Sequence, residues 1–231
     1  MLNQKLSFDF DKRKAAVNAI NKVDSEYPIL LGSGSTVDLV IEEFAKKYSP
    51  QYEFVSASTL TSNKLLKHGF KEIEVDSITK SANLVCIDGA DQIISIQGLN
   101  YCLKGHGGAF VREKRLWALA SKIYVTVDKS KFTDNFTTYI PIEILQNAEN
   151  EVISRLKEND FRFTDIRLRL DSQHQSLITD NHNLILDLFY DKELTVKNSI
   201  ELDAQLHQIP GTVDTGLFLN EFADKTEIIT S

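Results

Sequence analysis

The sequence predicts an α/β protein: a Rossmann-like domain with a doubly wound, mostly parallel sheet, plus a smaller ferredoxin-like α+β domain. From residue 11 to about residue 127, apolar runs alternate with segments of helical periodicity, as in parallel strands joined by crossover helices. After residue 131 the order becomes strand, helix, strand, strand, helix, strand, which is typical of ferredoxin-like domains. We assign residues 1–136, with 219–231 returning, to the first domain and 137–218 to the second.

The first domain is expected to begin with a helix that starts near Asp11 and carries Val17, Ile20 and Val23 on one face. A buried strand follows over 28–31 and ends at Gly32. The next helix has apolar residues three and four apart, namely Val37, Val40, Ile41 and Phe44. Further strands are predicted over 52–56, 83–87, 101–103 and 123–127, and further helices over 60–68, closed by Gly69, and 109–121. The run 227–229 is expected to return as an edge strand.

The second domain is expected to contain four strands and two helices. The strands are predicted over 139–144, 166–170, 184–188 and 213–218, and the helices over 149–158 and 195–206. Between the second and third strands, the segment Thr-Asp-Asn-His-Asn at 179–183 has the residues of a turn. Turn chemistry explains this segment without a functional role.

The composition limits the possible partners and location. The net charge is −7, with acidic and basic residues interspersed, so no positive stripe for nucleic acid is expected. The chain has no signal-peptide pattern and no apolar run near the ~20 residues that cross a bilayer, so we expect a cytoplasmic protein without membrane contact. Cys86 and Cys102 lie in apolar strand-like runs and are expected to be buried, reduced thiols.

A glycine-rich turn, Gly32-Ser33-Gly34-Ser35-Thr36, follows the first strand and opens a helix. Backbone N–H groups and hydroxyls at a helix start suit a phosphate. A dinucleotide fits less well, because Val37 stands where the third glycine of that fingerprint belongs, and the lysine of a Walker loop is absent. A serine-capped helix without a ligand is the structural alternative.

The turn Asp88-Gly89-Ala90-Asp91 places two carboxylates directly after an apolar strand. Such groups accept hydrogen bonds from sugar hydroxyls and can move protons between oxygens. A metal site and a simple Asp-capped turn are the alternatives; no histidine or third carboxylate stands at ligand spacing. Both this turn and the glycine-rich turn begin where a strand ends, which is where ligands collect in open α/β sheets.

Three further positions are candidates for chemistry. Lys104 precedes the flexible run Gly105-His106-Gly107-Gly108 and can balance an oxyanion, whereas His106 is more typical of a pocket rim and stays outside the catalytic set. Glu113 falls in the first turns of a helix, where it is either a base or an ordinary first-turn acid. Lys131, after a strand and turn, is a candidate contact for an anion or hydroxyl, and a surface role is equally compatible.

Taken together, these segments resemble type A ribose-5-phosphate isomerases over nearly the whole chain. The resemblance rests on Gly32-Ser33-Gly34-Ser35-Thr36, Asp88-Gly89-Ala90-Asp91, Lys104-Gly105-His106-Gly107, Arg112-Glu113-Lys114, Thr179-Asp180-Asn181, and Ile209-Pro210-Gly211 through Gly216-Leu217-Phe218. It implies a homodimer or dimer of dimers that interconverts ribose 5-phosphate and ribulose 5-phosphate in the non-oxidative pentose phosphate pathway, without metal or organic cofactor.

The resemblance also implies roles for single residues. Glu113 would move the proton between C2 and C1 through an enediolate, Lys104 would offset the oxyanion, and Asp88 would handle protons on the sugar oxygens, including ring opening. Asp91 and Lys131 would hold hydroxyls. The phosphate would bind Ser33, Gly34, Ser35 and Thr36, with Lys12 reaching in from the first helix. The remaining substrate contacts would come from Gly89, Ala90, Gly105, His106 and Gly107.

The sequence departs from the family pattern at four positions. Ser33 replaces a threonine, His106 a glycine, Gly108 an alanine and Gln92 an acid. A side chain at His106 would narrow the pocket or shift the sugar preference. Two other function classes remain open: a sugar-phosphate-binding sensor without catalysis, and acyl or CoA transfer with Glu113 as nucleophile. A sensor of this kind would carry a DNA-binding segment before the first helix, where only some ten residues are expected here.

Overall fold

The computed structural model describes residues 2–23, 27–47, 52–78, 83–137, 139–159, 161, 163–190 and 193–231, with the backbone alone for 2–9. Its central sheet has six parallel strands in the order β13-β7-β4-β1-β2-β3. They are β1 (Ile29–Leu31), β2 (Glu53–Ser56), β3 (Lys71–Glu72), β4 (Val85–Asp88), β7 (Lys122–Thr126) and β13 (Thr226–Ile229). This is the doubly wound order, and the chain reverses direction across the sheet between β1 and β4.

Helices cover both faces of this sheet, which is why its strands are apolar throughout. In β1, Ile29 and Leu31 pack with α2, whereas Leu30 between them packs with α4 on the other face. The helices are α1 (Leu2–Ile20), α2 (Ser35–Lys47), α3 (Thr59–Lys67) and α4 (Phe110–Leu119). The four apolar residues expected to face the core from α2 are all buried. The predicted doubly wound arrangement is therefore confirmed.

A three-stranded antiparallel sheet, β12-β6-β5, lies beside the parallel sheet. It consists of β5 (Gln92–Ile96), β6 (Leu99–Leu103) and β12 (Leu217–Phe218). The sequence analysis missed β5 because Gln97-Gly98, with φ of 52° and 82°, makes the hairpin turn without the usual Asn-Gly or Asp-Gly signal. The single strand expected over 213–218 is also wrong, since β11 (Thr212–Thr215) and β12 belong to different sheets.

Gly216 stands at the break between β11 and β12. A Cβ at this position would lie 2.2 Å from the carbonyl oxygen of Lys104. The two segments are also joined by a hydrogen bond of 2.8 Å, which the Lys104 amide donates to the Gly216 carbonyl oxygen. The chain can therefore pass close to the segment that carries Lys104 only because residue 216 lacks a side chain.

The second part of the molecule is an antiparallel sheet in the order β11-β8-β10-β9. Its strands β8 (Ile140–Ile144), β9 (Phe163–Leu168), β10 (Leu184–Tyr190) and β11 are joined through α5 (Glu149–Glu158) and α6 (Val196–Leu206). The Thr195 side chain caps α6 by accepting a hydrogen bond of 3.2 Å from the Asn198 amide. The βαββαβ order confirms the ferredoxin-like prediction.

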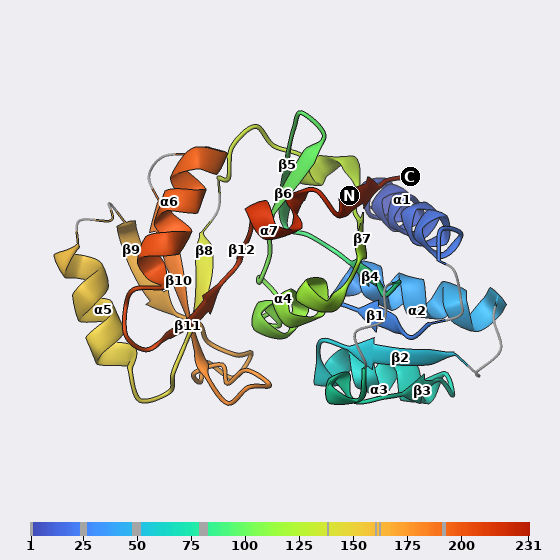
Figure 1. The fold of residues 1–231 in the computed structure, drawn as a ribbon, viewed down its shortest axis with the longest axis horizontal. Coiled ribbons are helices and arrows are strands. Elements are labelled where there is room, and N and C mark those ends of the chain that lie inside the picture. Colours follow the sequence, from blue (N-terminus) through green and yellow to red (C-terminus); the bar gives the residue numbers. More distant parts are fainter. Residues whose placement is uncertain are drawn as a thin grey trace.

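The two sheets are linked by a shared apolar core. Ile94, Tyr101 and Leu103 of the three-stranded sheet pack in one cluster with Ile142 and Leu186 of the four-stranded sheet. Figure 1 shows β8–β11 with α5 and α6 at one end of the molecule, β1–β4 with α1–α3 at the other, and α4, β5, β6 and the short helix α7 (Asn220–Ala223) between them. The domain limits at 136/137 and 218/219 stay a prediction.

Other expectations had mixed outcomes. Residues 226–229 do return as an edge strand, β13, paired with β7. Gly69 does close α3, with φ of +77°. Cys86 and Cys102 are buried and free. The first helix begins at Leu2 and not near Asp11, and Val17 is 37% exposed although Ile20 is buried. None of the described helices is both long and apolar enough to span a bilayer.

Candidate active site

A pocket opens at the carboxyl edge of the parallel sheet, where Gly32 follows β1 and Asp88 ends β4. This edge is the reversal point of the sheet, where doubly wound proteins bind ligands. The lining residues are Lys12, Ser33, Gly34, Ser35, Thr36, Gly89, Ala90, Asp91, Lys104, Gly105, Gly107, Ala109, Glu113, Val127, Asp128 and Lys131. Of the residues predicted for the site, Asp88 and His106 are not part of this lining, and Ala109, Val127 and Asp128 are additions.

Asp88 lies behind the pocket wall and is fully buried. Its Oδ2 accepts a hydrogen bond of 2.7 Å from the Trp117 indole N–H, and its Oδ1 accepts one of 2.7 Å from the Gly89 amide. The carboxylate packs flat against Gly32, where a Cβ would fall 1.8 Å from Oδ1. Gly32 is thus required to make room for this acid, in addition to ending the strand.

Lys104 joins the two buried acids of the site. Its Nζ is 2.9 Å from Asp88 Oδ1, 3.2 Å from Glu113 Oε2 and 2.5 Å from the Gly89 carbonyl oxygen, and the residue is 4% exposed. Burial acts to lower the pKa of Lys104, but the charges of Asp88 and Glu113 outweigh it and raise the pKa above its ordinary value. The two neighbouring carboxylates therefore favour the charged ammonium form of Lys104.

Glu113 points from the first turn of α4 toward the glycine-rich turn. Its Oε1 accepts hydrogen bonds of 3.1 Å from the Ser33 amide and 2.6 Å from the Ser33 hydroxyl. Burial, followed by the nearby charge of Asp88, raises the pKa of Glu113 to about 7, against the opposing effects of Lys104 and Ser33. A carboxylate with this pKa is suited to take up and release a proton near neutral pH.

The glycine-rich turn presents the start of α2 to the same pocket. Gly34 has φ of +96°, a conformation that favours glycine, and α2 begins at Ser35. The Lys12 ammonium of α1 donates a hydrogen bond of 3.2 Å to the Ser35 hydroxyl. Free N–H groups at the helix start and a neighbouring ammonium form an anion site. Because Ser33 contacts Glu113 directly, the anion site and the buried acids lie side by side.

The sequence of residues 53–230 matches the family described as ribose 5-phosphate isomerase A (phosphoriboisomerase A). The chain belongs to this family. Ribose-5-phosphate isomerase A of Pasteurella multocida is 32% identical over 217 residues, which are 92% of this chain and 91% of that protein. The protein of that name from Francisella tularensis subsp. novicida is 30% identical over 232 residues, covering 99% and 95%.

Solved structures of the isomerase family share the fold of the chain. The structure from Methanocaldococcus jannaschii aligns with a TM-score of 0.80 at 27% identity, covering 95% of this chain and 96% of that one. The structure from Plasmodium falciparum aligns with a TM-score of 0.81 at 28% identity, covering 94% and 92%. As a member of this family, the chain is a sugar-phosphate isomerase.

His106, where the family resemblance led us to expect a glycine, is absent from the lining of the pocket. The ring stacks on Tyr139 with centroids 4.5 Å apart, and burial lowers the pKa of the imidazole. The His106 amide donates a hydrogen bond of 3.0 Å to Asp91 Oδ2, whereas the ring Nδ1 is 3.5 Å from Asp91 Oδ1. The side chain therefore does not narrow the pocket, contrary to the expectation from the sequence.

Two residues that support the isomerase site were not identified from the sequence. Trp117 was expected only as a core residue, yet its N–H fixes Asp88. Arg169, buried after β9, donates hydrogen bonds of 2.6 Å to the Gly105 oxygen and 3.2 Å to the His106 oxygen, and its Nε is 3.0 Å from Asp187 Oδ2. A sequence signal existed, because Asp187 interrupts the apolar strand 184–188 and a buried acid needs a partner.

Across the described part of the chain, no group of three or more His, Cys, Asp or Glu side chains is arranged to hold a metal ion.

Proposed function

We propose that this chain interconverts D-ribose 5-phosphate and D-ribulose 5-phosphate through an enediolate, with Glu113 as the base, in the non-oxidative pentose phosphate pathway of the cytoplasm. The observation that supports this most directly is the placement of Lys104 between two buried acids, one of which hydrogen-bonds Ser33 of the anion site. A phosphate and a base less than one pentose apart are what the reaction requires.

In this proposal the substrate phosphate binds the amides and hydroxyls of residues 33–36, with Lys12 adding a positive charge. When the phosphate binds, it replaces Glu113 as the acceptor of the two Ser33 hydrogen bonds, which frees the Glu113 carboxylate for chemistry. Asp91 and Lys131, both in the lining, hold sugar hydroxyls. The sugar chain then extends from α2 toward Lys104.

The reaction moves one proton between neighbouring carbons. Glu113 takes the C2 proton, the electron pair forms the C1–C2 double bond, and negative charge develops on the oxygen at C1 beside Lys104. O1 then takes up a proton from the Lys104 ammonium, and the O2 hydroxyl returns one to the lysine. Return of the carbon proton from Glu113 to C1 leaves a hydroxyl at C1 and a carbonyl at C2. A preorganised donor such as the Lys104 ammonium is worth roughly 2.7–4 kcal/mol of transition-state stabilisation.

Asp88 is placed behind Lys104 in this scheme. Its carboxylate is fully buried and bonded to Lys104, Gly89 and Trp117. Proton exchange on the sugar oxygens, including ring opening, would therefore pass through the Lys104 ammonium, which Asp88 keeps charged and oriented. Lys104 contacts the substrate in this scheme, and Asp88 acts on the substrate only through Lys104.

The test is conversion of ribose 5-phosphate to ribulose 5-phosphate by the purified protein, before and after EDTA treatment. Turnover should survive chelation, and Glu113→Gln should bind the sugar phosphate yet lose about 10²–10⁴-fold in kcat. Glu151→Gln, the same change in the first turn of α5 at an exposed position, is the matched control and should be silent. Full activity in Glu113→Gln would remove the proposed base, and binding without turnover by the unaltered protein would support a sensor instead.

The family resemblance also leads us to propose a homodimer or a dimer of dimers. Light scattering on the purified protein would measure the assembly directly.

A further inference from the structure

The turn at 179–183 is closed by its own hydrogen bonds. The Thr179 amide donates to the Asn183 carbonyl and the His182 amide donates to the Thr179 carbonyl, each at 2.9 Å. The Thr179 hydroxyl oxygen accepts from the amides of Asn181 and Asn183, each at 3.2 Å. The segment is therefore a preformed turn, as its composition predicts.

A buried acid anchors this turn to the four-stranded sheet. Glu143 of β8 is fully buried, and its Oε1 accepts hydrogen bonds of 3.2 Å from the Thr179 hydroxyl, 3.0 Å from the Asn181 side-chain amide and 2.8 Å from that of Asn183. Charged acceptors make stronger hydrogen bonds than neutral ones, and a buried carboxylate needs them. The side-chain amides of the turn are thus held on its inner side.

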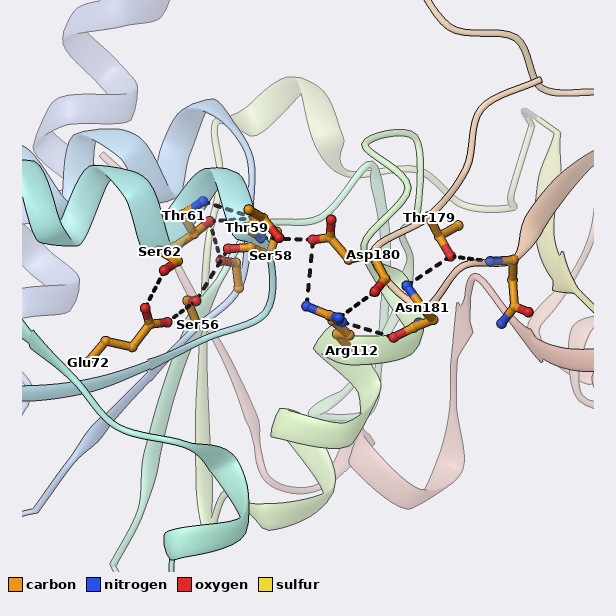
Figure 2. A network of polar contacts seen from close by, with 12 residues as sticks. Ser56, Ser58, Thr59, Thr61, Ser62, Glu72, Arg112, Thr179, Asp180 and Asn181 are labelled. Carbon is orange, nitrogen blue, oxygen red and sulfur yellow. Dashed lines mark hydrogen bonds and ion pairs between the residues drawn. The ribbon is translucent and has the colours of Figure 1, made fainter. Parts of the chain in front are cut away.

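The outer side of the turn contacts two helices of the Rossmann-like part, as Figure 2 shows. Asp180 Oδ2 accepts a hydrogen bond of 2.8 Å from the Thr59 amide at the start of α3, a favourable place for an acid. Arg112 of α4 donates to Asn181 Oδ1 at 2.9 Å and to the Asp180 carbonyl at 2.5 Å. Arg112 NH1 also lies 3.7 Å from Asp180 Oδ2. The guanidinium therefore grips the turn at several points.

Both of these helices hold parts of the active site. On α3, the buried Thr61 hydroxyl donates a hydrogen bond of 3.1 Å to the carbonyl of Gly32, which precedes Ser33. On α4, Glu113 directly follows Arg112, and Trp117 one turn later fixes Asp88. The turn at 179–183 consequently touches the element behind the anion site and the element that carries the proposed base.

We infer that Arg112, Asp180 and Asn181 form a positioning clamp that holds the start of α4 so that the Glu113 carboxylate faces Ser33 and Lys104. The inference rests on the proposed role of Glu113. Arg112 and Asn181 are absent from the lining of the active-site pocket, so their effect passes through the backbone of α4. A base displaced by about 1 Å can lose about 10²-fold in rate, so a modest loosening of α4 should be measurable.

The experiment compares two arginines of the same helix. Arg112→Ala removes the clamp, whereas Arg115→Ala removes an ion pair with Asp76 whose side chains are 58% and 84% exposed. We expect Arg112→Ala to lower kcat about tenfold with KM changed less than about threefold, and Arg115→Ala to leave both unchanged. Arg112→Lys, which keeps the charge but loses the forked geometry, should fall between Arg112→Ala and the unaltered enzyme.

Two further readouts separate positioning from a loss of stability. If α4 loosens, Glu113 becomes better hydrated and the acid limb of the kcat profile should move to lower pH in Arg112→Ala, which a merely less stable enzyme would not show. The double variant with Asn181→Ala should lose less kcat than the two single losses combined, because both changes break the Arg112–Asn181 hydrogen bond.

Equal kcat values for the two arginine variants would overturn the clamp, as would an unmoved acid limb or additive losses in the double variant. Activity per folded molecule serves as the measure for any variant with a lowered melting temperature. Failure of the clamp leaves the proposed function intact, since that function is tested separately by Glu113→Gln.

Discussion

Two of the buried charge clusters in the described part of the chain differ in their balance. In the ferredoxin-like part, Arg169 pairs with Asp187 and also donates hydrogen bonds to the carbonyls of Gly105 and His106, so one cation meets one acid. At the edge of the parallel sheet, Lys104 is shared by Asp88 and Glu113. There one cation meets two acids.

The difference indicates what each cluster does. The Arg169–Asp187 pair is structural, because the same guanidinium binds the carbonyls of Gly105 and His106 and so holds the segment after Lys104. In the cluster around Lys104, burial and then the nearby charge of Asp88 raise the pKa of Glu113 to about 7. A buried acid with a pKa raised in this way is a candidate for proton exchange, in line with the proposed role of Glu113.

We expect the largest effect from breaking the Arg169–Asp187 pair, and we expect it in the free energy of unfolding. Arg169→Met leaves Asp187 buried without its partner, so we expect a loss of about 3–5 kcal/mol in the free energy of unfolding, measured by urea denaturation. The control variant Arg167→Met removes an exposed ion pair with Asp165 and should lower the free energy of unfolding by less than about 1 kcal/mol. Equal losses in the two variants would show that burial of the pair is not what matters.

Breaking the unbalanced cluster should mainly affect turnover. Lys104→Met removes the charge that we propose offsets the oxyanion, and we expect kcat/KM for ribose 5-phosphate to fall about 10²–10³-fold. Lys71→Met, at an exposed lysine paired with Glu53, is the control and should keep full activity. A Lys104→Met enzyme within threefold of the original would refute the assignment of Lys104.

The titration of Glu113 sharpens the contrast. Since the base must be ionised, kcat/KM should fall about tenfold per pH unit below a pH of about 7 and level off above it. The folded state holds this proton more tightly than the unfolded chain does, so the Glu113 contribution to stability decreases as pH rises from about 4.5 to about 7. A flat rate profile down to pH 5 would contradict the raised pKa.

The smallest effect is expected at His106. The His106 ring lies 3.5 Å from the Asp91 carboxylate, whereas the His106 backbone amide donates the shorter hydrogen bond of 3.0 Å to it. His106→Gly keeps this amide and its hydrogen bond. We expect KM to change less than about threefold and kcat to stay constant, as for weak polar contacts. The assay should include an aldose phosphate of six carbons, because a broadened sugar range would show that the side chain shapes the pocket after all.

The sequence predicted most of what local pattern and chemistry determine. Apolar spacing located α2, and strand ends located Gly32 and Asp88 at one edge of the sheet. The family resemblance then suggested the roles that we propose for Lys104 and Glu113. Twelve of the fourteen predicted substrate-binding residues line the pocket, the exceptions being Asp88 and His106.

What the sequence did not predict depends on contacts between distant segments. Whether Asp88 lines the pocket or lies behind it is decided by Trp117, and the direction of the His106 ring is decided by Tyr139. The turn at 179–183 forms as expected, but its bond to Thr59 spans 121 residues and leaves no local pattern. The split between β11 and β12 was missed because residues of high strand propensity stand on both sides of Gly216, and only the approach of Lys104 explains this glycine.

The place of β13 beside β7 has a consequence for biosynthesis. Residues 226–229 are translated after the whole four-stranded sheet, yet they complete the six-stranded sheet that is otherwise made from residues 29–126. While the ribosome is still making the intervening segment, β7 has an open edge available to other chains. Pairing with β13 covers this edge only after residues 226–229 have been synthesised, so β7 is one of the last strands to be protected from pairing with other chains.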